Sequence, residues 1–182
     1  RRGLQPRRRP ASGLHRRRNG LLVHVAETSG QRGRSLAFHL MCGPDETPAV
    51  LHPFQKPDVW GLDMYLALKR GRVVLNAESD LNRGEAGNMR LFEATGVGGF
   101  LLTEAQSNLA DYFEPGREVE TFDSPGELDE KIAYYLEHPD QRAAIARNGQ
   151  RRCLEDYSLT RRAAALDDLL RRHLGLAAKS EA

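Results

Sequence analysis

Cysteines are few and long apolar runs are missing, and both absences exclude whole classes of protein. The 182-residue chain has two cysteines, Cys42 and Cys153, far apart and without the spacing of metal ligands. The sequence therefore predicts neither a disulfide framework nor a bound metal. Its longest apolar stretches have about five residues, too few to span a membrane. With no recognisable secretory leader, a reduced cytoplasmic setting is expected.

Acidic residues are almost absent from the first 34 positions, which hold ten Arg and only Glu27, a net charge of +9. The remainder holds 17 basic and 24 acidic residues, a net charge of −7. Residues 1–20 carry Arg triplets and two Pro, which predicts a basic, disordered arm. Because no aromatic residue is interleaved to stack on bases, we do not expect nucleic acid as a partner. The first residue is Arg, so a fragment of a longer protein is also expected.

Secondary-structure signals before Trp60 are weak. Residues 21–27 (LLVHVAE) are apolar and β-branched enough for a strand. Residues 35–42 (SLAFHLMC) fit a helix or a strand, and the pattern does not decide. Residues 43–58 are a connector punctuated by proline.

From Trp60 onwards the signals are stronger. Helices are expected over 61–71, 88–95, 124–138, 140–148 and 159–173, and strands over 72–77, 99–103 and 118–122. Ser124 is the expected cap of its helix, with Pro125 in the first turn and Glu127 closing a capping box. Gly96 is the expected C′ residue of its helix. The last helix is expected to bury four apolar residues: Ala163, Leu166, Leu169 and Leu170.

This alternation predicts an α/β fold, a Rossmann-like parallel sheet with helices on both faces over residues 21–175. Residues 176–182 are expected to form a flexible tail. Ligands of such sheets bind beyond the carboxyl ends of the strands. The loops after Asn76 and Thr103 open on that edge.

The stretch GEAGNMRLFEATGVGGFLLTE (84–104) places polar residues at the start of a helix on that edge. Unpaired N–H groups of a first helical turn attract anions, and Gly84 and Gly87 let the backbone approach a phosphate. Arg90 could contact a diphosphate, and Glu93, on the same face, could accept hydrogen bonds from two ribose hydroxyls. Together these groups suit a nucleoside diphosphate. The alternative is a solvated Glu93, a surface ion pair at Arg90 and glycines that only form turns.

The order of these motifs resembles the C-terminal half of group 1 glycosyltransferases, in the branch related to spore-maturation glycosyltransferase-like proteins. The resemblance runs from about Trp60 to Leu170, through the NMRLFEATG helix, the EPGRE turn and the EHPDQR helix pair. It implies a GT-B architecture, in which two Rossmann-like domains face a cleft and the C-terminal one binds a nucleotide-sugar donor.

The resemblance also implies roles for five residues. Two glutamates separated by seven residues mark the donor site in the wider retaining group, and Glu85 and Glu93 have that separation. Glu93 would hold the donor ribose and Glu85 would lie near the sugar. Asn88 and Arg90, beside Gly87, would line the diphosphate region. No cofactor beyond the nucleotide-sugar substrate and no metal is implied, and no catalytic residue is assigned.

The predicted function is hexosyl transfer from a nucleotide sugar to an unidentified acceptor. Two Rossmann-like domains do not fit in 182 residues, so an N-terminal acceptor domain is expected to be missing. The chain alone is expected to be inactive or weakly hydrolytic. The family's basic residues from an early loop are not identifiable beyond two candidates, Arg32 and Arg34. The alternative is a non-catalytic interaction module on a degenerate fold, tethered to an anionic partner by its basic arm.

Overall fold

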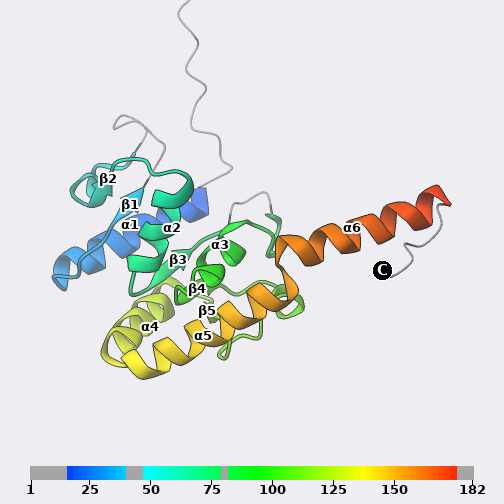
Figure 1. Ribbon diagram of the computed structural model, residues 1–182. Helices are drawn as coiled ribbons and strands as arrows, with labels where there is room; N and C mark the ends of the chain where they lie inside the picture. The colour runs from blue at the N-terminus through cyan, green and yellow to red at the C-terminus, as the bar shows by residue number, and fades with distance from the viewer. Residues whose placement is uncertain (1–15, 40–46, 79–81, 176–182) are drawn as a thin grey trace, which may run out of the picture.

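A computed structural model describes residues 16–39, 47–78 and 82–175 (Figure 1). The expected arm over 1–15, the undecided residues 40–42 and the expected tail over 176–182 lie outside this part. The elements are, in order, α1 (Arg16–Gln31), β1 (Phe38–His39), η3 (Ala49–Phe54), β2 (Gln55–Lys56), α2 (Gly61–Arg70), β3 (Val74–Asn76), α3 (Arg90–Gly96), β4 (Leu101–Glu104), η5 (Leu109–Asp111), β5 (Glu120–Phe122), α4 (Pro125–Glu137), α5 (Pro139–Asp156) and α6 (Leu159–Leu174). None of these helices is long and apolar enough to cross a membrane.

The predicted parallel sheet is confirmed, and β4 is its central strand. β3 and β5 both pair with β4 in parallel, with Val74 opposite Leu101 and Leu102 opposite Glu120. β1 and β2 form a separate two-stranded parallel pair. All four residues of β4 are buried, as expected for a strand covered on both faces.

Helices cover both faces of the sheet, and each face has its own core. Leu102 belongs to a cluster that includes buried residues of α1 and α4. Leu101 belongs to a second cluster, built with α3 and the segment around η5. Because successive side chains of a strand point to opposite faces, these two neighbouring leucines serve different cores.

The strand expected over residues 21–27 is wrong, because these residues lie inside α1. Its buried positions are Leu21, Val25, Ala26 and Ser29, and their spacing matches one face of a helix. That face contributes to the first core, so burial at helical spacing outweighs the β preference of the valines. The disordered arm is also wrong for residues 16–20, which form the first turn and a half of this helix.

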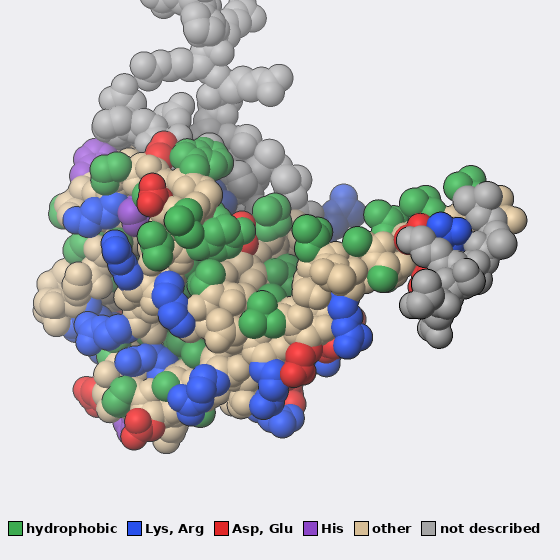
Figure 2. Space-filling model, viewed as in Figure 1, with side chains coloured by type: hydrophobic (Ala, Val, Ile, Leu, Met, Phe, Trp, Pro, Cys, Tyr) green, Lys and Arg blue, Asp and Glu red, His purple; other side chains and the backbone are tan. Residues whose placement is uncertain are grey.

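The last helix is confirmed as α6, ending at Gly175 in the left-handed conformation, but its expected burial is wrong. None of its residues is buried, and Leu166 is 55% exposed. The helix extends away from the body of the protein, and hydrophobic side chains remain visible along it (Figures 1 and 2). An amphipathic pattern identifies the apolar face of a helix but not what covers that face.

Two helix ends also differ from expectation. Gly96 is the last residue of α3 rather than the C′ residue, and Gly98 is the glycine with positive φ (70°). α5 continues eight residues beyond the expected end at Asn148. Its extension carries Gly149 and Cys153, which are buried.

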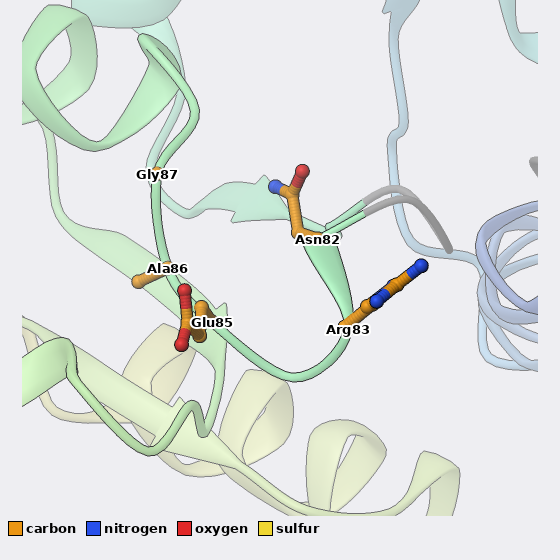
Figure 3. A pocket seen from close by; sticks show the side chains of 5 residues that line it. All are labelled: Asn82, Arg83, Glu85, Ala86 and Gly87. Atoms are coloured by element: carbon orange, nitrogen blue, oxygen red, sulfur yellow. The ribbon is translucent and has the colours of Figure 1, made fainter.

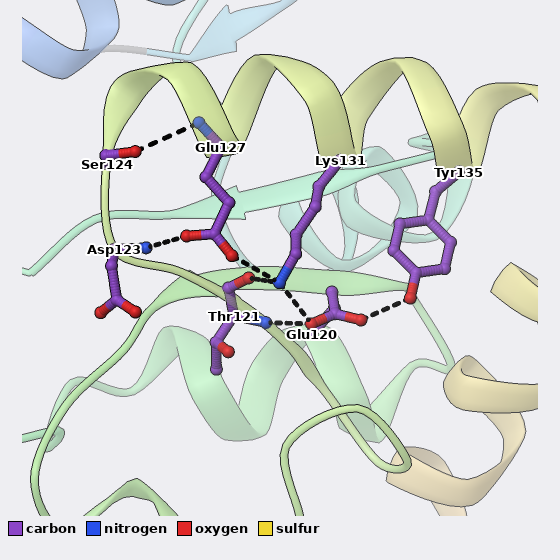
Figure 4. A network of polar contacts seen from close by, with 7 residues as sticks. All are labelled: Glu120, Thr121, Asp123, Ser124, Glu127, Lys131 and Tyr135. Carbon is purple, nitrogen blue, oxygen red and sulfur yellow. Dashed lines mark hydrogen bonds and ion pairs between the residues drawn. The ribbon is translucent and has the colours of Figure 1, made fainter.

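A polar network joins β5 to α4 (Figure 4). Glu120, buried at the start of β5, accepts hydrogen bonds from Lys131 Nζ at 3.1 Å and from the Tyr135 hydroxyl. The expected cap is confirmed, with Ser124 Oγ accepting from the Glu127 N–H at 3.2 Å. The Glu127 carboxylate accepts from the Asp123 N–H at 2.7 Å and pairs with Lys131 at 2.9 Å. It therefore reaches one residue further back than a capping box requires.

Gly149, the single glycine of α5, is predicted to be sensitive to substitution. A Cβ at this position would lie 2.2 Å from the backbone oxygen of Glu118, so Gly149→Ala must push α5 away from the turn that precedes β5. We expect a loss of about 1–3 kcal/mol in the free energy of unfolding. Gly20→Ala in α1 is the matched control, since nothing lies within 4 Å there, and it should stabilise by roughly 0.5–1 kcal/mol. Urea denaturation measures both, and equal effects would refute the close contact.

Glu127 is predicted to make stability depend on acid pH. The Asp123 N–H and then Lys131 hold its pKa below the ordinary value of 4.5. A carboxyl with a lowered folded-state pKa stabilises above its unfolded pKa, and the contribution disappears as pH falls through the folded value. Glu127→Gln should therefore cost below about 1 kcal/mol at pH 7, and the difference should shrink as pH falls below the ordinary carboxyl pKa of 4.5. Thermal unfolding at pH 7 and across the acid range tests this, with exposed Glu130→Gln on the same helix as control. A difference in stability between Glu127→Gln and the wild type that stays constant with pH would contradict it.

Candidate functional site

A hollow of about 320 Å³ lies beyond the carboxyl end of β3, on the edge where α/β sheets bind ligands. Its lining is formed by Asn82, Arg83, Glu85, Ala86 and Gly87 (Figure 3). All five come from the connection between β3 and α3. The sequence predicted a site in this connection.

A tight turn shapes the start of this lining. The Glu85 N–H donates to the Asn82 carbonyl at 2.9 Å, and Arg83 and Gly84 have φ of 50° and 88°. Two positive φ values in succession match a type I′ turn. Arg83 is the only residue other than glycine with positive φ in the described part of the chain. The turn sends the side chains of Arg83 and Glu85 to different sides of the loop (Figure 3).

The segment after β4 holds this loop. Asn108 Oδ1 accepts from the Ala86 N–H at 2.6 Å, and its Nδ2 donates to the Ala86 carbonyl at 3.1 Å. The Ser107 N–H and hydroxyl both donate to the Gly84 carbonyl, at 3.1 and 3.2 Å. Neither Ser107 nor Asn108 was predicted from the sequence. Their position just beyond a predicted strand was the available signal.

A chain of amides ties Asn88 to the sheet. Asn88 Nδ2 donates to Asn76 Oδ1 at 2.9 Å, and Asn76 Nδ2 donates to Thr103 Oγ1 at 2.9 Å. These bonds join the carboxyl ends of β3 and β4 to the residues before α3. Asn88 Oδ1 is buried and accepts no hydrogen bond. Asn88, predicted to line a diphosphate, therefore has a structural role through its nitrogen.

The start of α3 offers fewer free donors than expected. The Leu91 N–H donates to the Asn88 carbonyl at 3.4 Å, and the N–H groups of Phe92 and Glu93 both donate to the Met89 carbonyl at 3.0 Å. The expectation of unpaired N–H groups is therefore wrong for these three residues. The turn is closed on itself because Met89, the N-cap, already has helical dihedral angles.

Arg90 and Glu93 contact each other. Their side chains form an ion pair at 3.1 Å, with exposed fractions of 35% and 13%. Both lie outside the lining of the hollow, as does Asn88, whereas Glu85 and Gly87 line it. The structure thus brings together two of the five predicted site residues, and it forms the ion pair that was the alternative interpretation of Arg90.

Two buried glutamates on this edge were not predicted. Glu78 and Glu104 end the runs that contain β3 and β4, and both are buried. Glu104 Oε2 accepts from the Glu78 N–H at 2.7 Å, and Arg17 of α1 pairs with Glu104 at 3.0 Å. The Glu78 carboxylate accepts from Asn82, one of the lining residues. The signal in the sequence was a carboxylate directly after each apolar run.

The two basic candidates from the early loop have another role. Arg32 and Arg34 pair with Asp129 of α4, at 2.8 and 2.6 Å. They therefore fix the segment directly after α1 to α4. Across the described ranges, no group of His, Cys, Asp or Glu side chains is arranged to hold a metal ion.

Comparisons with known proteins agree with this architecture. The family model described as glycosyl transferase-like matches residues 17–168. The chain belongs to this glycosyltransferase-like family. No curated protein matches it significantly.

Solved structures show that this glycosyltransferase-like chain has the fold of a GT-B glycosyltransferase domain. A glycosyltransferase from Rickettsia africae superimposes with a TM-score of 0.67 and 13% identity, covering 86% of this chain and 45% of its own. Anabaena Alr3699/HepE, crystallised in complex with UDP, has a TM-score of 0.57 and 16% identity, covering 66% of this chain and 33% of its own. The chain thus spans between a third and a half of these two proteins.

The turn at the hollow is predicted to require Gly84. Its φ of 88° strains any residue with a Cβ, so Gly84→Ala should lower the free energy of unfolding by about 1–2 kcal/mol. Gly87→Ala is the control in the same loop, because φ is not positive and nothing lies within 4 Å of the added methyl. It should change stability by less than about 0.5 kcal/mol. Chemical denaturation of both variants tests this, and equal costs would contradict the turn geometry.

Proposed function

We propose that this domain binds the nucleoside-diphosphate sugar of a glycosyltransferase, for hexosyl transfer to an acceptor. The observation that carries the proposal is the hollow at the carboxyl end of β3, in a chain that the family model matches over residues 17–168. A hollow at this edge is where an open α/β sheet accommodates a ligand.

The lining residues suit the sugar end of such a donor. Glu85 is exposed, lines the hollow, and can accept hydrogen bonds from sugar hydroxyls. Gly87 has no side chain, so a phosphate can approach the backbone closely. Asn82 contributes an amide at the opposite end of the lining.

Arg90 and Glu93 suit the nucleotide end. The Arg90 guanidinium is partly exposed and can turn from Glu93 to a diphosphate, where charge-assisted bonds are stronger. The Glu93 carboxylate would then be available for the two ribose hydroxyls. The complex of Anabaena Alr3699/HepE with UDP supports uracil as the first base to test.

Transfer also needs an acceptor held against the donor. Because the two structural relatives are two to three times longer than their matched portions, we propose that a second domain supplies the acceptor site. The 182-residue chain would then bind donor without transferring its sugar efficiently.

Thermal unfolding with UDP, GDP and ADP sugars at millimolar concentration tests donor binding. Ligand at about 100 times its dissociation constant stabilises by roughly 2.7 kcal/mol, a shift of about 5–10 °C for a chain of this size. We expect one nucleotide to give such a shift. Cooperative unfolding without a shift for any of them would count against the proposal.

Variants locate the site. Glu85→Gln and Glu93→Ala should each reduce the ligand-induced shift by at least half while the unliganded protein stays folded. The exposed Glu130→Ala on α4 is the control and should keep the full shift. If all three variants retain it, the donor does not contact Glu85 or Glu93.

A further inference from the structure

We infer that Asn108 is a positioning residue for the donor, because it fixes the loop whose residues line the hollow. The inference rests on the proposed function. Asn108 itself is not among the lining residues. It acts through Ala86, to which it makes both of its side-chain hydrogen bonds.

The two bonds pair both polar backbone groups of one residue, Ala86. Asn108 Oδ1 accepts from the Ala86 N–H at 2.6 Å, while Nδ2 donates to the Ala86 carbonyl at 3.1 Å. The Ala86 side chain is buried in the second core with Leu91 and Leu109. Glu85 and Gly87, on either side of it, are exposed and line the hollow. Fixing the backbone of Ala86 therefore fixes the direction of both neighbours.

Asn108 is well placed to hold another segment because it is held itself. It is the N-cap of η5, and its carbonyl accepts from the Asp111 N–H at 3.1 Å. The next residue, Leu109, is buried in the second core. Ser107 adds two bonds to the Gly84 carbonyl, so the loop is attached at Gly84 and at Ala86.

Only a side-chain amide supplies what this position needs. Ala86 presents one N–H and one carbonyl, and a primary amide matches them with one acceptor and one donor. A carboxylate at position 108 would accept from the N–H but face the carbonyl without a proton to donate. Alanine would satisfy neither group. Asn108 is therefore specific in chemistry as well as in size.

The two hydrogen bonds between Asn108 and Ala86, here called the clamp, would act on ligand affinity. Arg83 has a φ of 50° in the adjoining turn, a conformation that a free loop rarely adopts. Without Asn108 the loop would sample other conformations, and donor binding would have to order it again. The expected consequence is weaker binding that exceeds any loss of global stability.

The test compares Asn108→Ala and Asn108→Asp with Asn148→Ala in the full 182-residue chain. Asn148 donates a similar side-chain bond, to the Arg117 carbonyl at 3.2 Å, in a contact between α5 and the residues before β5. Calorimetric titration with UDP, GDP and ADP gives affinities, and amide hydrogen exchange reports on Ala86. Denaturation shows that the variants fold.

We expect Asn108→Ala to weaken nucleotide binding about tenfold or more, as two lost hydrogen bonds would. Its Ala86 amide should exchange faster. Asn108→Asp should keep that amide protected and bind with intermediate affinity, whereas Asn148→Ala should resemble the wild type in both measurements. Equal affinities for Asn108→Ala and Asn148→Ala would overturn the inference, and so would unchanged exchange at Ala86.

Failure of the proposed function gives a different result. If the wild-type chain binds none of the three nucleotides, both the proposed function and the role of Asn108 in donor binding are refuted. Faster exchange at Ala86 in Asn108→Ala would then show that the clamp exists without serving a nucleotide.

Discussion

Burial of β4 on both faces is the constraint on which the rest of the structure depends. Its two leucines enter different cores, and β3 and β5 both pair with it in the same direction. Parallel pairing brings the carboxyl ends of β3, β4 and β5 to one edge. The segment that follows β4 can therefore hold the loop that follows β3, and this loop lines the hollow.

Polar groups at the ends of buried strands need partners, since an unpaired buried donor or acceptor costs about 1–3 kcal/mol. Here the partners come from neighbouring segments of the same edge. Asn88 donates to Asn76, and Asn76 donates to Thr103. The Glu78 N–H donates to the Glu104 carboxylate. Arg17 adds a charge from α1. The edge thus carries two groups of polar contacts, and Asn88, which was predicted to line a ligand, also supports the fold.

The sequence predicted the elements whose signals are local. The strands around β3 and β4 are compact apolar runs, and Ser124 with Glu127 marks the start of α4 without any tertiary information. Residues 21–27 were misassigned because a short apolar run fits a strand or a buried helix face equally well. Site prediction met the same limit. The spacing of Arg90 and Glu93 placed them on one face of α3 but did not decide whether each contacts a ligand or the other.

The free energies of the competing contacts indicate how Arg90 and Glu93 could still bind a donor. A partly exposed ion pair is worth up to about 1 kcal/mol, whereas hydrogen bonds to a charged group contribute about 1.5–3 kcal/mol. A diphosphate with two charge-assisted bonds would therefore displace Glu93 from Arg90. The freed carboxylate is only 13% exposed, so water would compensate it poorly. Two ribose hydroxyls would supply the missing donors. In the proposed function, the phosphate contact and the ribose contact therefore strengthen each other. A ligand that carries only one of the two groups would bind less tightly than it would if the two contacts were independent.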